Sequence, residues 1–392
     1  MNPHLAVCAL ALALVACGSR ALPETSDGAT CGGLTILPPV GFDCAQGFYP
    51  VGLDISQGRI FHTALKTPGG SDLDLFARDV ASGQVEQLTS DETRTEILAT
   101  DNGEVLYSAH GKDPAAGQLY RQTPSHLVDL GLRSDPGTDG VFSQYTARPA
   151  RLMSQGAVVW RAARAIYRHD GVSTHAIAGV TNLHYLDFDH RGGSVVWTDV
   201  QDIYLYRGGA VTALTHDDVD DRRPRLCGSS VYWICGDAIC RWDGAATQQM
   251  DSGTCTDLTT DDARAAWICG NQVMLHDGKT TRGIAGNRGD DTTARDGLRL
   301  DGGRVAWLET KQSSPGGMDE RGKIYLSDGS STVLVAEVGL PCMVCNALWP
   351  PLQLALAGDV IAWSYHLDGD PPTYDYRGGR CAHATIRDEE CR

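Results

Sequence analysis

A short phrase recurs eight times along the chain, and this repeat limits the possible folds more than any other feature of the sequence. Each copy has a turn residue, then two or three mostly apolar residues, and ends at an aromatic residue or histidine. The eight end residues are His62, Tyr107, Trp160, Trp197, Trp233, Trp267, Trp307 and Trp363. Successive copies lie 34 to 56 residues apart. Repeats of this length indicate an array of similar units, because a single unit of this size cannot bury its own apolar surface.

Each copy predicts a group of short β-strands. The apolar runs are four to six residues long, are rich in β-branched and aromatic residues, and are bounded by Gly, Asp or Asn, which is typical of strands. In the third to sixth copies a second strand begins six residues after the Trp, as at Ile166 and Ile203. A third strand is clearest at 84–91 and 210–217. The fourth and innermost strand is expected just before each phrase, as at 185–190.

Four short strands in each period of about 43 residues predict an all-β chain folded as a β-propeller. Eight copies favour eight blades of four antiparallel strands. Seven blades are the alternative, if the first or last copy is a cap or if the terminal strands complete one shared blade. The repeated tryptophans are expected to be large apolar wedges between blades rather than a stacking surface for a ligand.

The start of the chain predicts an export signal. The apolar run from Leu5 to Ala16 is about a dozen residues long, whereas a membrane-spanning helix needs roughly 20. The sequence LVAC at 14–17 resembles the lipobox of bacterial lipoproteins, which implies that Cys17 is acylated and becomes the first mature residue. The alternative is an ordinary secretory signal. Gly18 follows the cysteine, and by resemblance to the sorting rule of enteric bacteria this favours the outer membrane of the cell envelope, with the membrane face left open.

The chain therefore divides into three predicted parts. Residues 1–16 are a lipoprotein signal peptide, 17–30 are a polar, flexible tether, and 31–392 are a single β-propeller domain. The 49 acidic against 33 basic residues give a net charge of −16, which argues against nucleic acid as a partner.

The cysteine content agrees with export. Eleven cysteines remain after the signal peptide and Cys17 are set aside, and exported chains commonly join such residues in disulfides. Short spacings suggest Cys31 with Cys44, Cys381 with Cys391, and a third group between residues 227 and 269. Because the total is odd, at least one thiol is free or intermolecular.

The repeat pattern is similar to the Tol-system-type, WD40-like propeller repeats of bacterial periplasmic proteins. The shared elements are the glycine-led apolar and aromatic strand, an I-Y-x-x-x-G-G strand and an L-T-x-D ending, over most of residues 50 to 380. The resemblance implies a protein-interaction propeller in the cell envelope. The Ser-Pro-Asp-Gly turn common in that group is reduced here to DNGE, LDGG or SQGA, so the resemblance supports the fold more than the role.

The best chemical cluster is HYLDFDH at 184–190. In a strand, alternation places Asp187 and Asp189 on one face and His190 on the other, so the two carboxylates can converge on a calcium ion or an acid–base site near the propeller axis. The alternative is that these are hydrogen-bonded or solvated side chains at a strand end. The aspartates of DDVDDRRP at 217–224 are a second candidate, for which an exposed loop is the alternative. No cofactor is predicted beyond this Ca²⁺, which nothing else in the sequence supports.

Two hypotheses of function follow. The sequence contains no G-x-S-x-G elbow and no phosphate-binding G-x-x-x-x-G-K-[ST] loop. Regular repeats without a convincing catalytic set favour a lipid-anchored binding or scaffold module for an envelope protein or a polysaccharide. The alternative is a metal-dependent polysaccharide lyase or hydrolase whose acidic and histidine residues lie at the propeller axis.

Overall fold

The computed structural model describes residues 34–36, 40–43, 53–65, 73–90, 94–110, 117–124, 126–133, 151–162, 164–181, 187–286, 293–314, 317–339, 353–366 and 379–388. Within these ranges all regular secondary structure is β, with 33 strands and no helix. The same ranges accordingly contain no helix long and apolar enough to cross a membrane. The all-β prediction is confirmed.

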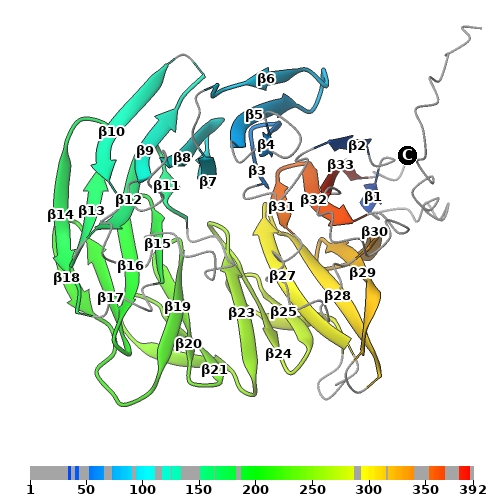
Figure 1. Cartoon of the computed structure of the whole chain (residues 1–392). Helices are drawn as coiled ribbons and strands as arrows, with labels where there is room; N and C mark the ends of the chain where they lie inside the picture. The colour runs from blue at the N-terminus through cyan, green and yellow to red at the C-terminus, as the bar shows by residue number, and fades with distance from the viewer. Residues whose placement is uncertain are drawn as a thin grey trace, which may run out of the picture.

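The strands form eight antiparallel blades of four strands, here lettered A to D from the axis outward (Figure 1). Blade 1 consists of β3 (Leu53–Ser56), β4 (Arg59–Leu65), β5 (Leu73–Asp79) and β6 (Val85–Gln87), and blade 2 of β7 (Arg94–Asp101), β8 (Glu104–His110), β9 (Gly117–Gln122) and β10 (Leu127–Arg133). Blade 3 consists of β11 (Met153–Ser154), β12 (Ala157–Ala162), β13 (Ala165–His169) and β14 (Thr174–Gly179), and blade 4 of β15 (Phe188–Arg191), β16 (Ser194–Asp199), β17 (Asp202–Arg207) and β18 (Ala210–Ala213).

The second half of the ring repeats this plan. Blade 5 consists of β19 (Asp221–Cys227), β20 (Ser230–Cys235), β21 (Ala238–Trp242) and β22 (Thr247–Asp251), and blade 6 of β23 (Cys255–Thr260), β24 (Ala265–Cys269), β25 (Gln272–His276) and β26 (Thr281–Ala285). Blade 7 consists of β27 (Thr293–Asp301), β28 (Arg304–Ser314), β29 (Gly317–Ser327) and β30 (Thr332–Gly339). Each A strand contacts the A strand of the next blade, and the ring closes between β31 of blade 8 and β3 of blade 1.

Blade 8 is built from both ends of the described chain. It contains β31 (Leu354–Ala357), β32 (Val360–His366) and β33 (Gly379–Asp388), and its outer strand is supplied by β1 (Leu34–Ile36) and β2 (Val40–Asp43), which both pair with β33. Figure 1 shows the blue β1 and β2 beside the red β33. The terminal strands therefore do complete one shared blade, but it is the eighth. The eight-blade prediction is confirmed, and the seven-blade alternative is wrong.

The repeated tryptophans form the core between blades. All six are at most 2% exposed. Trp233 of blade 5 packs in one cluster with Val196 of blade 4, and Trp307 of blade 7 packs with Ala266 of blade 6. Large aromatic side chains in such positions bury much apolar surface, and replacing one by alanine typically costs about 3 to 5 kcal/mol. The predicted wedge role is confirmed.

A hydrogen bond from each of several A strands fixes the blades relative to one another. The residue six positions before the repeated aromatic accepts a backbone N–H from the A–B turn of the next blade. The pairs are Ser56 with Gly103 (2.8 Å), Asp101 with Gln155 (2.7 Å), Ser154 with Gly192 (3.2 Å), Asp261 with Gly303 (3.0 Å) and Asp301 with Gly358 (2.7 Å). In these five positions only Ser or Asp occurs, because both are short acceptors that reach a neighbouring turn. The propeller is thus tied together at the end where its A strands finish.

The A–B turns explain the altered turn sequences of the repeats. Asn102 and Gly103 both have positive φ, as do Gln155 and Gly156. Two successive positive φ angles define the type I′ turn that joins tightly paired strands, and Asn-Gly is a favoured sequence for it. DNGE and SQGA are therefore tight hairpin turns.

Candidate functional site

The Asp189 side chain connects three blades through hydrogen bonds. The side chain lies on β15 and is fully buried. Its Oδ2 accepts the backbone N–H of Leu226 in blade 5 at 2.8 Å, and its Oδ1 accepts the N–H of Arg151, just before blade 3, at 3.3 Å. The Nε of Arg151 lies 3.6 Å from the same Oδ1. These partners occupy both carboxylate oxygens.

Asp187 is held by a second arginine. Nη1 of Arg225 donates to Oδ1 of Asp187 at 2.9 Å, and the Arg225 side chain is only 4% exposed. Burial alone lowers the pKa of Arg225, but the negative charges of Asp187, Asp189 and Asp257 outweigh it, so the net effect is a raised pKa. Arg225 therefore stays charged at the axis, because three carboxylates surround it.

Arg151 also contacts blade 6. Its Nη2 donates to the backbone carbonyl of Thr260, and lies 2.8 Å from the Thr260 hydroxyl oxygen. Thr260 belongs to blade 6, three blades away from Arg151 around a ring of eight. The Arg151 side chain therefore links the entry to blade 3 with Asp189 of blade 4 and Thr260 of blade 6.

The sequence suggested that Asp187 and Asp189 converge on a calcium ion or an acid–base site, whereas in the structure Asp187 pairs with Arg225 and Asp189 with Arg151. Among the residues that the structure describes, no group of three or more histidine, cysteine, aspartate or glutamate side chains is arranged to hold a metal ion. His184 and Tyr185 of the same motif lie outside the described residues. The observed geometry gives the two carboxylates a stabilising role, because cations already neutralise them.

His190 lies in the wall between blades. It is 0% exposed, and neither ring nitrogen has a hydrogen-bond partner. Burial, with a smaller contribution from the positive charge of Arg168, lowers the pKa of His190 to about 4. A neutral imidazole without partners is a packing residue, so no hydrogen bond connects it to the carboxylates as an acid–base group.

The second acidic candidate is likewise held by local bonds. Asp217 accepts the N–H of Val219 at 3.0 Å, and Asp220 pairs with Arg222 at 3.3 Å. Asp221 is buried and accepts the indole N–H of Trp233 at 3.0 Å. These aspartates shape the connection into blade 5.

The cysteines of blades 5 and 6 form the expected group. Cys235 is bonded to Cys240, and Cys255 to Cys269. Cys227 is a buried free thiol whose pKa burial raises to about 12, so it is unreactive at neutral pH. The predicted disulfides in this group and the free thiol are confirmed.

The other cysteine predictions cannot be compared with the structure. Cys17, Cys31, Cys44 and Cys391 lie outside the described residues, and so does the side chain of Cys381. The signal peptide and the tether also lie outside them.

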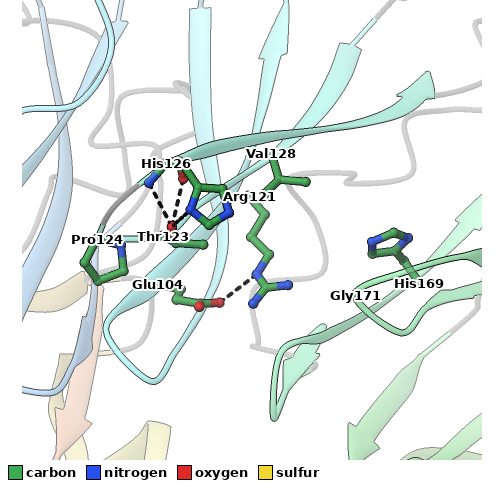
Figure 2. Close-up of a pocket in the computed structure, with 8 residues that line it drawn as sticks. All are labelled: Glu104, Arg121, Thr123, Pro124, His126, Val128, His169 and Gly171. Atoms are coloured by element: carbon green, nitrogen blue, oxygen red, sulfur yellow. Dashed lines mark hydrogen bonds and ion pairs between the residues drawn. The ribbon is translucent and has the colours of Figure 1, made fainter.

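A pocket that the sequence did not predict lies between blades 2 and 3 (Figure 2). It has a volume of about 350 Å³. The lining residues are Glu104, Arg121, Thr123, Pro124, His126, Val128, His169 and Gly171. They come from the start of β8, the end of β9, the following turn with the start of β10, and the end of β13 with its turn. Such positions share no periodic pattern, which is why sequence reasoning missed them.

An ion pair forms one wall of the pocket. Nε of Arg121 donates to Oε2 of Glu104 at 2.6 Å, and its Nη1 donates to the carbonyl of Gly156 in the next blade at 2.7 Å (Figure 2 shows the ion pair). Arg207 makes the same kind of bond from blade 4, since its Nη1 donates to the carbonyl of Ser229 in blade 5 at 3.2 Å. Arg121 thus both joins two blades and faces the pocket.

Two imidazoles flank the ion pair, and threonines orient both of them. Nδ1 of His126 lies 3.0 Å from the Thr123 hydroxyl oxygen, and that hydroxyl also donates to the carbonyl of His126 at 2.9 Å. The backbone N–H of His126 also donates to this hydroxyl at 3.0 Å, so Thr123 holds both the backbone and the ring of His126. Nδ1 of His169 lies 3.1 Å from the hydroxyl of Thr174 on the paired strand.

The two ends of the propeller differ in the length of their connections. A–B and C–D turns between described strands are two to five residues long, and they share one end, here called the A–B end. B–C and D–A connections share the opposite end, called the B–C end, and include 134–152, 340–353 and 367–378. Every connection longer than five residues between described strands is at the B–C end.

Comparisons with known proteins assign no role to this chain. No family model matches the chain, and no curated protein matches it. Among solved structures, the chain is similar to a prolyl endopeptidase at 13% identity and a TM-score of 0.48, covering 81% of this chain and 54% of that one. A post-proline cleaving enzyme from Rickettsia typhi gives 9% identity and a TM-score of 0.49, with 82% and 58% covered.

A propeller domain is also among the similar structures. The β-propeller domain of the Trilobed protease from Pyrococcus furiosus matches at 8% identity and a TM-score of 0.47, covering 74% of this chain and 95% of that one. The chain spans little more than half of the two enzymes named above. Likenesses this distant carry no argument about activity, so the β-propeller fold rests on the strands and blades themselves.

Proposed function

We propose that this protein is an exported, lipid-anchored β-propeller that acts as a binding module for an envelope protein or a polysaccharide, and that it binds through its B–C end. The observation that carries the proposal is that every connection longer than five residues between described strands lies at that end. In repeat folds, insertions of variable length collect on one face, and that face is often the binding face.

The strands of blade 7 support the same end. β28 and β29 are 11 residues each, longer than any other B or C strand, and they join at 315–316 on the B–C side. The extra length of this hairpin adds to that side of the ring alone. The A–B end, in contrast, has short turns, several of which are tied to the neighbouring blade by the Ser and Asp side chains described above.

The axial residues favour binding over catalysis. A metal-dependent lyase or hydrolase needs carboxylates that can bind a metal or accept a proton. Here Asp187 and Asp189 are paired with arginines, and His190 is fully buried between blades. No set of described residues therefore supports the lyase or hydrolase alternative.

Export and anchoring are supported by two features. Two disulfides in blades 5 and 6 fit an oxidising compartment, and the LVAC sequence before Gly18 resembles a lipobox. In this proposal Cys17 holds the protein at the outer membrane through 17–30.

The test is amine crosslinking with mass spectrometry on native envelopes, with C17S as the control for anchoring. The chain has five lysines. Lys66 and Lys112 belong by sequence to B–C connections, and Lys311 lies near the B–C end of β28. Lys279 lies in a C–D turn at the opposite end of the propeller. We expect partner crosslinks from the first three and none from Lys279.

A polysaccharide partner would leave no protein crosslinks, so the same envelopes are also digested with glycan-cleaving enzymes before extraction. Release of the C17S protein from the envelope fraction by such digestion supports the polysaccharide arm. If C17S shows neither partner crosslinks nor retention, or if crosslinks come from Lys279 alone, the proposed binding face is wrong.

A further inference from the structure

We infer that the pocket between blades 2 and 3 is a second binding site, and that it takes a neutral sugar unit. The pocket is at the A–B end, because Glu104 follows an A–B turn and His126 and Gly171 lie at C–D turns. It is therefore separate from the B–C face of the proposed function, and either idea can fail without the other.

The electrostatics of the pocket select a neutral ligand. Arg121 and Glu104 cancel one another as an ion pair at 2.6 Å, with side chains only 14% and 17% exposed. Burial lowers the pKa of His169, and although Asp170 opposes this, Arg121 reinforces it, so this imidazole is neutral at neutral pH. An anion in the pocket would meet Glu104, and a cation would meet Arg121. Neither charge gains a net attraction.

The hydrogen-bonding groups match a polyhydroxylated ligand. The pocket offers a donating guanidinium, an accepting carboxylate and two imidazoles, all facing one space (Figure 2). Each sugar hydroxyl both donates and accepts, so neighbouring hydroxyls can bond to both members of an arginine–glutamate pair. Pro124 and Val128 add apolar surface for the carbon-bound face of a sugar ring.

The pocket has the size and rigidity that such a ligand needs. A volume of about 350 Å³ is near the lower limit of small-molecule sites, which suits one sugar unit or the end of a short chain. The bonds of Thr123 to His126 and of Thr174 to His169 set the orientation of both rings in advance. Preorganised groups lose less conformational freedom on binding, so a small ligand can be held without rearrangement.

The experiment is saturation-transfer-difference NMR on the mature chain, followed by titration. The probes are glucose, galactose and N-acetylglucosamine as neutral sugars, and glucuronate as the charged counterpart. We expect at least one neutral sugar to bind with a millimolar Kd and more tightly than glucuronate. H126A and H169A are expected to weaken binding at least about tenfold, since both rings line the pocket.

A matched pair of variants separates the pocket from general stability. R121M removes the guanidinium from the pocket and its bond to the next blade, whereas R207M removes the equivalent bond between blades 4 and 5, and Arg207 does not line this pocket. We expect R121M to abolish binding and R207M to leave it unchanged, with similar losses of thermal stability in both. The inference is overturned if no neutral sugar binds, if glucuronate binds equally well, or if R207M loses binding as R121M does.

Discussion

His190 gives the sharpest test of how the core between blades responds to acid. The side chain is 0% exposed with both ring nitrogens unpartnered, and its pKa falls from 6.5 to about 4 in the folded protein. As pH falls below 6.5, the unfolded chain takes up a proton at His190 that the folded chain refuses until about pH 4. Unfolding is therefore favoured progressively across this window, and by its lower end the shift corresponds to about 3 kcal/mol. Above pH 6.5 the group has no such effect.

H190L removes this titration. We expect its free energy of unfolding to fall less steeply with decreasing pH than that of the wild type, with a difference that grows to about 3 kcal/mol near pH 4. At neutral pH the leucine also removes two buried polar atoms without partners, so the variant is expected to be at least as stable there. Urea unfolding followed by tryptophan fluorescence at a series of pH values measures both quantities.

The control is H175L, at an exposed position on β14, which removes a histidine without touching the core. His62 in blade 1 is also buried, with a pKa lowered to about 4, so the wild type keeps a second acid-sensitive group and H190L removes only part of the total slope. If the curves of H190L and the wild type remain parallel between pH 6.5 and 4, the burial argument for His190 is wrong.

Three further changes test other parts of the core. D221N keeps an acceptor for the Trp233 indole N–H but removes a carboxylate whose pKa burial raises to about 6. The variant is therefore expected to be more stable than the wild type above pH 6, by up to about 3 kcal/mol. In the same urea titration, its free energy of unfolding should rise less as pH falls from 6 to 3.8. D189A leaves buried partners uncompensated and is expected to cost about 3 to 5 kcal/mol, measured by thermal unfolding, whereas D189N should lose less because an amide oxygen can still accept. Replacing Cys255 and Cys269 by alanine is expected to cost about 3 kcal/mol in denaturant titrations, because the bridge closes a loop with a sequence separation of 14, and no measurable cost would contradict the chain-entropy account.

The fold was predictable because its main signal is periodic. The tryptophans recur with the second strand at a fixed offset, and both features come directly from the packing of one blade against the next. The hydrogen bonds that tie the blades at the A–B end follow the same rule, since the acceptor always stands six residues before the repeated aromatic. This offset is visible in the sequence only after the A strands are known.

The chemistry of the axis was less predictable because it depends on a local irregularity. Strand alternation predicted that Asp187 and Asp189 share one face of their strand. Arg225, the partner of Asp187, lies in the next blade, where a register shift falls between Arg222 and Arg225. Apolar and polar periodicity does not reveal such a bulge. The carboxylates therefore suggested a metal site, whereas a buried cation takes the place of the metal.

The register of the closing blade makes one more prediction, about how the chain ends are joined. Leu34 pairs with Asp388, Thr35 with Arg387 and Ile36 with Ile386, so the antiparallel register of β1 and β33 is regular. Counting this register three residues further toward each chain end matches positions 31 and 391, which are both cysteines outside the described residues. We therefore expect a Cys31–Cys391 disulfide in place of the two short bridges that local spacing predicts.

Peptide mapping of the unreduced protein decides between these pairings. A crosslinked peptide containing Cys31 and Cys391 supports the register, whereas peptides joining Cys31 to Cys44 and Cys381 to Cys391 refute it. The physical consequence differs as well. A bridge between the first and last strands of the ring closes a loop of about 360 residues, and the chain-entropy cost of closing a loop grows with its length. C31S is therefore expected to destabilise the closed ring more than the loss of Cys255–Cys269 does, because the bridge it removes closes the longer loop.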